Sequence, residues 1–317
     1  MKITVLEPLG LSPADLEATL APLRSAGHDI TTYAERPASP EETISRIGDA
    51  EIVVIANMPF SGEVIRAADN VAFLAVAFTG VNHVDIDACR EAGIAVSNAA
   101  GFSTESVAEL TLGMMIAMLR NVVPADAVLR QGGTNAELFG RELSGMTVGI
   151  VGTGEIGRRV AQVLSVLGVR LLGYNRTHYP EMESLGMQYL ALDELLSASD
   201  VVSVHVALTP ETTNLLSAQR IAGMKPGAYL VNVARGKVVD SSAVAAALHE
   251  GRLAGAAIDV FETEPPIGED HPFLGAPNTV LLPHVAFGTR ESFQKRANIV
   301  VENIQAWLAG AQTRVVL

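Results

Sequence analysis

The sequence contains little cysteine and no long uninterrupted apolar run. Its single cysteine, Cys89, excludes an internal disulfide and a cysteine-cluster metal site, and we expect this side chain to fill core space. No apolar stretch reaches the roughly 18 residues of a membrane-spanning helix without polar interruption, so we predict no transmembrane segment. The first apolar segment is interrupted by Glu7 and Pro8, too soon for a secretory signal. We therefore expect a cytoplasmic protein.

Metal-binding and nucleophile motifs are missing as well. The chain has no H-E-x-x-H motif, no carboxylate cluster typical of a metal site and no Gly-x-Ser-x-Gly elbow. Some histidines show no metal-ligand spacing, and we expect them at the surface or in packing: His28, His83, His178, His249 and His271. The sequence therefore predicts no metal site and no serine-nucleophile chemistry.

Basic residues are few relative to acidic ones. Lysine and arginine together number 22 against 35 aspartates and glutamates, which gives a net charge of −13. This balance argues against nucleic acid or an anionic membrane surface as a partner. An anionic substrate would have to be attracted by local positive groups and not by the overall field of the protein.

The residues that are present describe a globular α/β chain. Hydrophobic residues make up 49% and charged residues 18% of 317 positions, enough for two domains that each bury a core. Apolar strand patterns alternate with helical ones, and Ser12 caps the first helix. Strands are expected at 3–6, 30–33, 52–55, 73–77, 93–97, 201–206, 229–233, 255–259 and 279–282. We also expect a buried connecting helix at 102–121 and a terminal helix near 290–308 that completes the first domain.

A glycine-rich turn between an apolar strand and a helix is the most specific motif. The strand ending near 151 leads into Gly152-x-Gly154-x-x-Gly157, a helical pattern opens on the last glycine, and a second strand covers 169–174. In this order, the first glycine permits a tight turn, the second lets the backbone approach a pyrophosphate, and the third lets helix and strand pack closely. The motif predicts a dinucleotide-binding unit. The alternative is an ordinary glycine-rich turn.

The end of the second strand indicates which dinucleotide binds. NAD sites usually carry an acidic residue there for the ribose 2′-hydroxyl, but this chain has Asn175, followed by Arg176 and Thr177. A neutral amide removes the charge that would repel a 2′-phosphate, and an arginine can hold that phosphate through its planar fork. We therefore predict NADP(H), with NAD(H) possible if Arg176 is only a solvated surface charge.

Three ionisable residues follow expected strands in the second half of the chain: Arg235, Glu264 and His284. Ligands of doubly wound folds bind outside the carboxyl ends of the strands. Reduction of a 2-keto acid needs a cation for the carboxylate, a proton donor for the developing alkoxide, and a carboxylate to orient a histidine donor. Singly, each residue could instead be a loop salt bridge, a solvated turn residue or a strand cap. Because all three residues follow a nucleotide-binding motif in the same chain, together they predict a catalytic site.

Several segments resemble the signature blocks of the D-isomer-specific 2-hydroxyacid dehydrogenases, including glyoxylate and hydroxypyruvate reductases. The resemblance covers nearly the whole chain and lies in the blocks 79–85, 98–109, 204–212, 231–240, 259–265 and 282–286. It implies that Arg235 binds the substrate carboxylate and carbonyl, that His284 is the acid/base, and that Glu264 is its partner. Backbone N–H groups of Thr79 and Gly80 would hold the other side of the carboxylate.

The resemblance also implies the cofactor contacts and the assembly. Cofactor contacts would come from Thr104, Glu155, Ile156, Asn175, Arg176, His205, Val233, Ala234 and Asp259. The implied fold has two Rossmann-like doubly wound domains separated by a cleft. The substrate domain would comprise 1–99 with 288–317, and the dinucleotide-binding domain 100–287. A homodimer built through the nucleotide domain is implied as well.

Departures from the family pattern bear on the substrate. Relatives acting on phosphoglycerate carry basic residues in the loop after the third strand, where this chain has 56–60 with no cation. We therefore expect a small, uncharged-tailed 2-keto acid such as glyoxylate, hydroxypyruvate or pyruvate, with Asn57 among the substrate-binding residues. A tryptophan often found in the dimer-arm loop is also missing, since 133–135 stand there. The alternatives are an NAD-linked enzyme that oxidises a 2-hydroxy acid and a nucleotide-sensing, corepressor-like binding protein.

Overall fold

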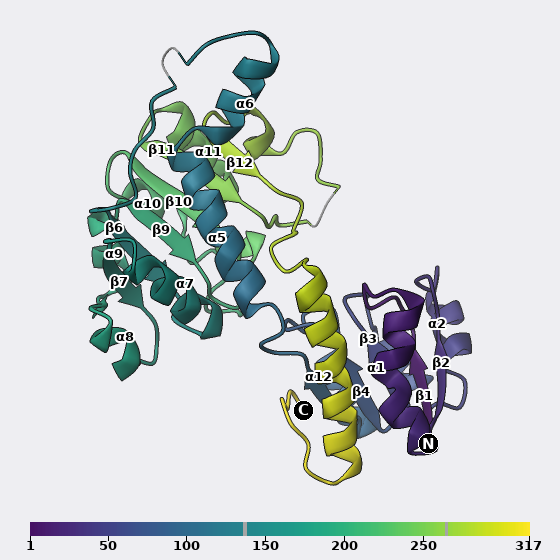
Figure 1. Ribbon diagram of the computed structural model, residues 1–317. Helices are drawn as coiled ribbons and strands as arrows, with labels where there is room; N and C mark the ends of the chain where they lie inside the picture. The colour runs from purple at the N-terminus through teal and green to yellow at the C-terminus, as the bar shows by residue number, and fades with distance from the viewer. Residues whose placement is uncertain (136–137, 264–265) are drawn as a thin grey trace. The chain divides into compact units, whose positions relative to one another are not determined.

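The chain forms two compact units, each built around a parallel sheet (Figure 1). The computed structural model describes residues 1–135, 138–263 and 266–317. The first unit comprises Met1–Ser103 with Gly288–Leu317, and the second comprises Thr104–Phe287. The second unit starts where helix α5 starts, a few residues beyond the expected boundary. Helices cover both sheets, so the predicted α/β, Rossmann-like class is confirmed.

The first unit holds a five-stranded parallel sheet in the order β2-β1-β3-β4-β5. Its strands are β1 (Lys2–Val5), β2 (Asp29–Thr32), β3 (Ile52–Ile55), β4 (Phe73–Val76) and β5 (Ala95–Asn98). Every residue of β3 and β4 is buried, because both are interior strands covered on both faces. This explains why their sequences are continuous apolar runs and not alternating ones.

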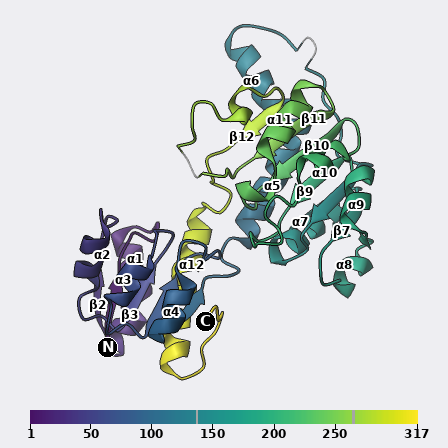
Figure 2. The ribbon, with the colours of Figure 1, turned by 180° about the vertical axis from the view of Figure 1, so that it is seen from behind.

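Five helices cover this sheet: α1 (Pro13–Ser25), α2 (Pro40–Ile47), α3 (Gly62–Arg66), α4 (Ile86–Ala92) and α12 (Arg290–Leu308). As predicted, Ser12 caps α1, because its hydroxyl accepts the backbone N–H of Asp15. Helix α12 packs beside α1, and its Trp307 stacks on Phe73 of β4 at 4.9 Å between ring centroids. Figure 2 shows α3 and α4 on the opposite face of the sheet from α12.

The second unit holds a seven-stranded parallel sheet in the order β12-β11-β10-β9-β6-β7-β8. Its strands are β6 (Thr147–Val151), β7 (Arg170–Tyr174), β8 (Gln188–Tyr189), β9 (Val201–Val204), β10 (Ala228–Asn232), β11 (Leu253–Ile258) and β12 (Thr279–Leu281). The chain runs outward from β6 to β8, then returns to β9 on the other side of β6. The strand order therefore reverses between β6 and β9, and ligands of such sheets bind at the carboxyl end of this point.

Two layers of helices pack on the two faces of the second sheet. One layer contains α5 (Thr104–Leu119), α7 (Glu155–Ser165) and α8 (Pro180–Ser184), and the other contains α9 (Leu192–Ala198), α10 (Ala218–Ala222) and α11 (Ser241–His249). Figure 1 is seen from the side of α5 and α7. The predicted burial of the helix that begins near residue 102 is confirmed for its methionines, because Met114, Met115 and Met118 are all buried.

The expected single helix over 102–121 is wrong at its end. Helix α5 stops at Leu119, and Asn121 adopts a left-handed conformation with φ of 51° before α6 (Val122–Arg130) begins. Among the described residues no single helix is long and apolar enough to span a membrane. The α5–α6 pair passes that test jointly, with a bend of 61° between them.

Candidate active site

The glycine turn after β6 has the shape that the motif predicts. Gly152 has φ of 98°, and a β-carbon there would lie 2.8 Å from the backbone of His205. A β-carbon on Gly157 would lie 2.0 Å from the carbonyl oxygen of Gly152, so α7 can approach the turn only because this residue has no side chain. A β-carbon on Gly154 would meet no atom within 4 Å, which leaves its backbone open to a ligand. Helix α7 begins at Glu155 and Ile156, with its N-terminus at this opening.

The end of β7 lies beside this turn. The backbone N–H of Gly152 donates to the carbonyl of Tyr174 at 2.8 Å, so Asn175 and Arg176 follow directly at the edge of the turn. The Asn175 amide donates to the carbonyl of Thr177 at 2.8 Å, which closes a small loop, and Arg176 is exposed. No acidic side chain stands in this loop, but Glu211 is close to Arg176. Hydrogen bonding by Thr209 and, less strongly, the positive charge of Arg176 lower the pKa of Glu211.

His205 lies at the point where the strand order reverses. Its backbone N–H donates to the carbonyl of Val151 at 2.8 Å, and its Nε2 is 2.8 Å from the hydroxyl of Ser203. Nδ1 is buried and makes no hydrogen bond to a described residue. Burial lowers the pKa of His205 to about 3, so the imidazole is neutral near pH 7. His205 therefore meets the glycine turn through its backbone and carries an uncharged ring beside Ser203.

The loop after β10 is held by an amide that the sequence analysis did not identify. Asn232 is buried; its Oδ1 accepts the N–H of Ala234 at 3.1 Å and its Nδ2 donates to the carbonyl of Arg235 at 3.0 Å. Val233 and Ala234 are both buried. The signal that could have revealed Asn232 is a polar amide inside an otherwise apolar strand, three residues before the expected Arg235.

The loops after β11 and β12 are joined by Asp259. This carboxylate is fully buried and accepts the N–H groups of Val285 and Ala286, each at 2.9 Å. The residue before them, His284, has φ of 56°, a left-handed conformation that a side-chain-bearing residue rarely adopts. The structure therefore shows Asp259 bonded to the histidine loop, a role that the sequence analysis did not foresee. The His284 ring meets Phe287 edge to face at 5.5 Å.

These loops lie at one edge of the sheet. The N–H of Asp259 donates to the carbonyl of Asn232 at 3.0 Å, and that of Leu282 donates to the carbonyl of Ile258 at 2.9 Å. Because β10, β11 and β12 are parallel neighbours, the loops that carry Arg235, Asp259 and His284 emerge side by side. The predicted partner of the histidine, Glu264, lies outside the described residues.

A second carboxylate near this edge is already engaged. Glu262 accepts a hydrogen bond from the hydroxyl of Ser241, and its other oxygen is 3.1 Å from Nε2 of His271. Burial raises the pKa of Glu262, but the hydrogen bonds, that from Ser241 first among them, bring it below its ordinary value. Both oxygens of Glu262 are thus taken up by contacts within the second unit, with Ser241 and with His271.

The other predicted site residues lie at the start of α5 and in the loops after β3 and β4. Thr104 is the first residue of α5, half-buried in the second unit. Thr79 and Gly80 follow β4 in the first unit, where the carbonyl of Thr79 accepts the side-chain N–H of Asn98 at 2.8 Å. Asn57 follows β3 in the same unit and is exposed. Among the described residues no cluster of histidine, cysteine or carboxylate side chains could hold a metal ion.

Comparisons with known proteins agree with this geometry. The family model described as D-isomer specific 2-hydroxyacid dehydrogenase, NAD binding domain, matches residues 112–286. A hydroxypyruvate reductase from Blautia hydrogenotrophica is 35% identical over all of this chain and 99% of its own. A glyoxylate reductase from Thermofilum pendens is 39% identical over 89% of this chain and 86% of its own.

Solved structures share the fold over the full length of the chain. An acyclic imino acid reductase in complex with NADPH and D-Arg has a TM-score of 0.90 and 27% identity, with all of both chains covered. With the glycine turn, the strand order and the family match in agreement, the chain belongs to the D-isomer-specific 2-hydroxyacid dehydrogenase family and is a nicotinamide-dependent oxidoreductase.

Proposed function

We propose that the protein reduces a small 2-keto acid of the glyoxylate, hydroxypyruvate or pyruvate type to the D-2-hydroxy acid, with NADP(H) preferred over NAD(H). The observation that carries this proposal is the strained backbone of His284, held by Asp259 beside the loop of Arg235. A non-glycine residue in a left-handed conformation is kept only where the surrounding structure over-determines it, and such strain concentrates at functional sites. The names of the two reductase relatives support the same substrate class.

In this proposal the residues of the chain bind the keto acid and move one proton. The bound nicotinamide ring supplies the hydride. Arg235 holds the substrate carboxylate and the carbonyl oxygen, and the backbone N–H groups of Thr79 and Gly80 hold the carboxylate from its other side. His284 donates the proton to the oxygen of the reduced carbonyl, while Glu264 keeps the imidazole oriented and stabilises its charged form.

The cofactor preference is assigned to Arg176. The glycine turn would take the pyrophosphate, and Arg176 would hold a 2′-phosphate beside Asn175, with no acidic residue in their loop to repel it. Contacts from Thr104, Thr177, His205, Val233 and Ala234 are proposed as the family resemblance implies. The closeness of Glu211 to Arg176 favours the second candidate, an NAD-linked enzyme, because a neighbouring acid opposes a 2′-phosphate.

Substitution of Arg176 tests the cofactor assignment. Arg176→Ala should raise the KM for NADPH about tenfold or more, because a charge-assisted hydrogen bond to a phosphate contributes roughly 1.5–3 kcal/mol. The KM for NADH should change far less. Arg159→Ala is a matched control, since Arg159 is a partly exposed arginine of α7 that pairs with Glu105 at 2.7 Å. Equal losses for NADPH and NADH in Arg176→Ala would reject the phosphate role.

A rate matrix tests the reaction itself. NADH and NADPH should each be measured against glyoxylate, hydroxypyruvate, pyruvate and phenylpyruvate, with the D configuration of the product determined by chiral analysis. The proposal expects turnover of the three small substrates, faster with NADPH. No turnover of any keto acid, together with tight cofactor binding, would support a corepressor-like protein instead. We also propose that the enzyme is a cytoplasmic homodimer.

A further inference from the structure

A buried carboxylate lies at the carboxyl end of the first sheet. Glu7, which follows β1, is only 1% exposed, and its Oε1 accepts the N–H groups of Ala56 and Met58 at 2.6 and 2.9 Å. Both donors belong to the loop after β3. Because a buried carboxylate is costly without compensation, this loop and Glu7 hold each other in one position.

The charge of Glu7 is compensated by Arg36. The Nε of Arg36 lies 2.7 Å from Oε2 of Glu7, an ion pair that lacks the angle of a hydrogen bond. The Arg36 side chain is otherwise 53% exposed. Arg36 reaches Glu7 from the loop after β2. The loop after β3 therefore has a cation beside it, although its own sequence contains none.

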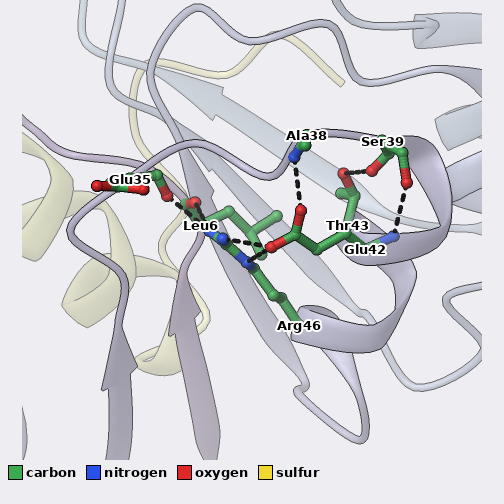
Figure 3. A network of polar contacts seen from close by, with 7 residues as sticks. All are labelled: Leu6, Glu35, Ala38, Ser39, Glu42, Thr43 and Arg46. Carbon is green, nitrogen blue, oxygen red and sulfur yellow. Dashed lines mark hydrogen bonds and ion pairs between the residues drawn. The ribbon is translucent and has the colours of Figure 1, made fainter.

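The segment that carries Arg36 is fixed on both sides (Figure 3). Arg46 of α2 donates from Nη1 to the carbonyl of Glu35 at 2.6 Å and lies 4.4 Å over the ring of Tyr33. On the other side of Arg36, the N–H of Ala38 donates to Glu42 at 2.6 Å, and Glu42 in turn accepts two hydrogen bonds from Arg46. Arg36 therefore extends from an anchored backbone.

This arrangement orients the amide of Asn57. Arg36 donates from Nη2 to Oδ1 of Asn57. Since a guanidinium can only donate, the contact fixes which end of the amide is the oxygen and turns the NH₂ group away from Arg36. That NH₂ group makes no hydrogen bond to any residue that the structure describes, and Asn57 is exposed. The result is a pair of N–H donors that Arg36 holds in one orientation.

The loop that carries Asn57 is bonded to the segment that follows Thr79 and Gly80, which are proposed to bind the substrate carboxylate. The N–H of Phe60 donates to the carbonyl of His83 at 2.8 Å, and that of Asp85 donates back to Phe60 at 3.0 Å. The loop with Asn57 and the loop with Thr79 and Gly80 are thus joined at the same edge of the first sheet. A substituent on C3 of a 2-keto acid is only a few bonds from its carboxylate, within reach of the neighbouring loop.

The charged groups near Asn57 are paired or buried. Glu7 offsets Arg36, and the third charged group nearby, Arg296, is only 4% exposed. Burial, opposed by the charge of Glu7, lowers the pKa of Arg296 to about 10. Its Nη2 donates to the carbonyl of Leu9 at 2.6 Å, and its guanidinium lies 4.7 Å over the ring of Phe293. The edge therefore presents the Asn57 amide together with a half-exposed Arg36 whose charge is paired with Glu7.

We propose that Asn57, oriented by the Glu7–Arg36 pair, selects 2-keto acids with a hydroxyl on C3. This inference rests on the proposed reductase function and deepens it. The Asn57 NH₂ donates to the hydroxyl oxygen of hydroxypyruvate, whereas glyoxylate has no C3 and pyruvate carries only a methyl group there. Glu7 and Arg36 are positioning residues, and Asn57 is the specificity-determining one.

The test is the ratio of kcat/KM for hydroxypyruvate to that for pyruvate, two substrates that differ by one hydroxyl. Asn57→Leu keeps the approximate size of the side chain and removes its donors. The ratio should fall about tenfold, mainly through the KM for hydroxypyruvate, as for loss of one hydrogen bond to a substrate. Arg36→Lys keeps a charge for Glu7 but cannot hold Glu7 and Asn57 together, so the ratio should fall by a smaller factor.

Arg90→Ala is the control, because Arg90 is an exposed arginine of the same unit that pairs with Asp87, and its removal should leave the ratio unchanged. Thermal melting shows that each variant is folded. A ratio that stays at the wild-type value in Asn57→Leu overturns the proposal, including the case in which both substrates weaken equally. Failure of the proposed function is distinguishable, since the wild-type enzyme would then turn over neither substrate.

Discussion

At the scale of single residues, the candidate site depends on buried polar side chains that hold the reactive ones in place. Asn232 bonds the N–H of Ala234 and the carbonyl of Arg235 in the loop that follows β10. Asp259 bonds the two N–H groups that follow His284. Loss of either would leave buried backbone groups without partners, at a cost of roughly 1–3 kcal/mol each. The loops of Arg235 and His284 are thus held in place by the protein itself.

Replacement of the proposed proton donor is the sharpest residue-level prediction. His284→Ala should lower kcat by about 10²–10⁴, the usual contribution of general acid catalysis, while the Kd for NADPH stays close to the wild-type value. Fluorescence titration gives the Kd and steady-state assays give kcat. His249→Ala, which removes an exposed histidine of α11, is the control. A fully active His284→Ala enzyme would show that another group donates the proton.

The placement of Arg235 and His284 in loops at the carboxyl edge of the sheet could be predicted from the sequence, because each residue follows an apolar strand within a few positions. Asn232 and Asp259 could not be given their observed roles, since their partners are defined by backbone geometry and not by residue type. The charge near the loop 56–60 could not be predicted for a similar reason. The loop has no cation of its own, and Arg36 reaches it from a different part of the chain.

At the scale of elements, the glycine turn and α7 form one rigid part. Three glycines serve three different purposes: Gly152 takes a positive φ, Gly157 allows close packing, and Gly154 leaves space. These demands are local to one strand, one turn and one helix. This is why the motif alone was sufficient to predict the unit, and why the structure reproduces it.

Two alanine substitutions in this turn should have opposite consequences. Gly157→Ala places a methyl group 2.0 Å from the carbonyl oxygen of Gly152 and should destabilise the protein by about 1–3 kcal/mol, as overpacking does. Gly154→Ala meets no protein atom within 4 Å, so it should keep stability within about 1 kcal/mol and weaken NADPH binding instead. Urea unfolding and NADPH titration separate the two effects. A stable Gly157→Ala variant would contradict the packing argument.

The break between α5 and α6 shows where element-level prediction failed. Apolar periodicity continues across 102–121, but the chain turns at Asn121, which adopts a left-handed conformation. Asparagine tolerates this conformation better than most residues. Periodicity reports which face is buried and not where a helix bends, so the end of α5 could not be inferred from it.

At the scale of the whole molecule, large apolar side chains are exposed on one helix of the second unit. Helix α6 has no buried residue, and Leu129 is 73% exposed. Val122 and Val123 of the same helix are exposed as well, as is Phe139 beyond it. Exposed apolar groups of this size gathered along one segment are typical of an interaction surface. They support the proposed homodimer.

The homodimer can be tested by removing this apolar surface. Sedimentation equilibrium should show a dimer for the wild-type protein, and Leu129→Glu should weaken association at least tenfold, because a charge would replace an apolar contact. Val166→Glu, at a residue 81% exposed at the end of α7, is the control for an added surface charge. A monomeric wild-type protein would refute the assembly, and an unaffected dimer would place the interface elsewhere.

The sequence by itself determined the class of fold, the dinucleotide turn and the position of Arg235 and His284 along the chain. These features depend on the periodicity of neighbouring residues and on the backbone freedom of particular glycines, which are local properties. Only the tertiary structure decided that Asp259 holds the loop of His284 and that Glu7 and Arg36 orient Asn57. Each of these contacts joins segments far apart in the sequence. They meet only because parallel strands bring their carboxyl ends to one edge of a sheet.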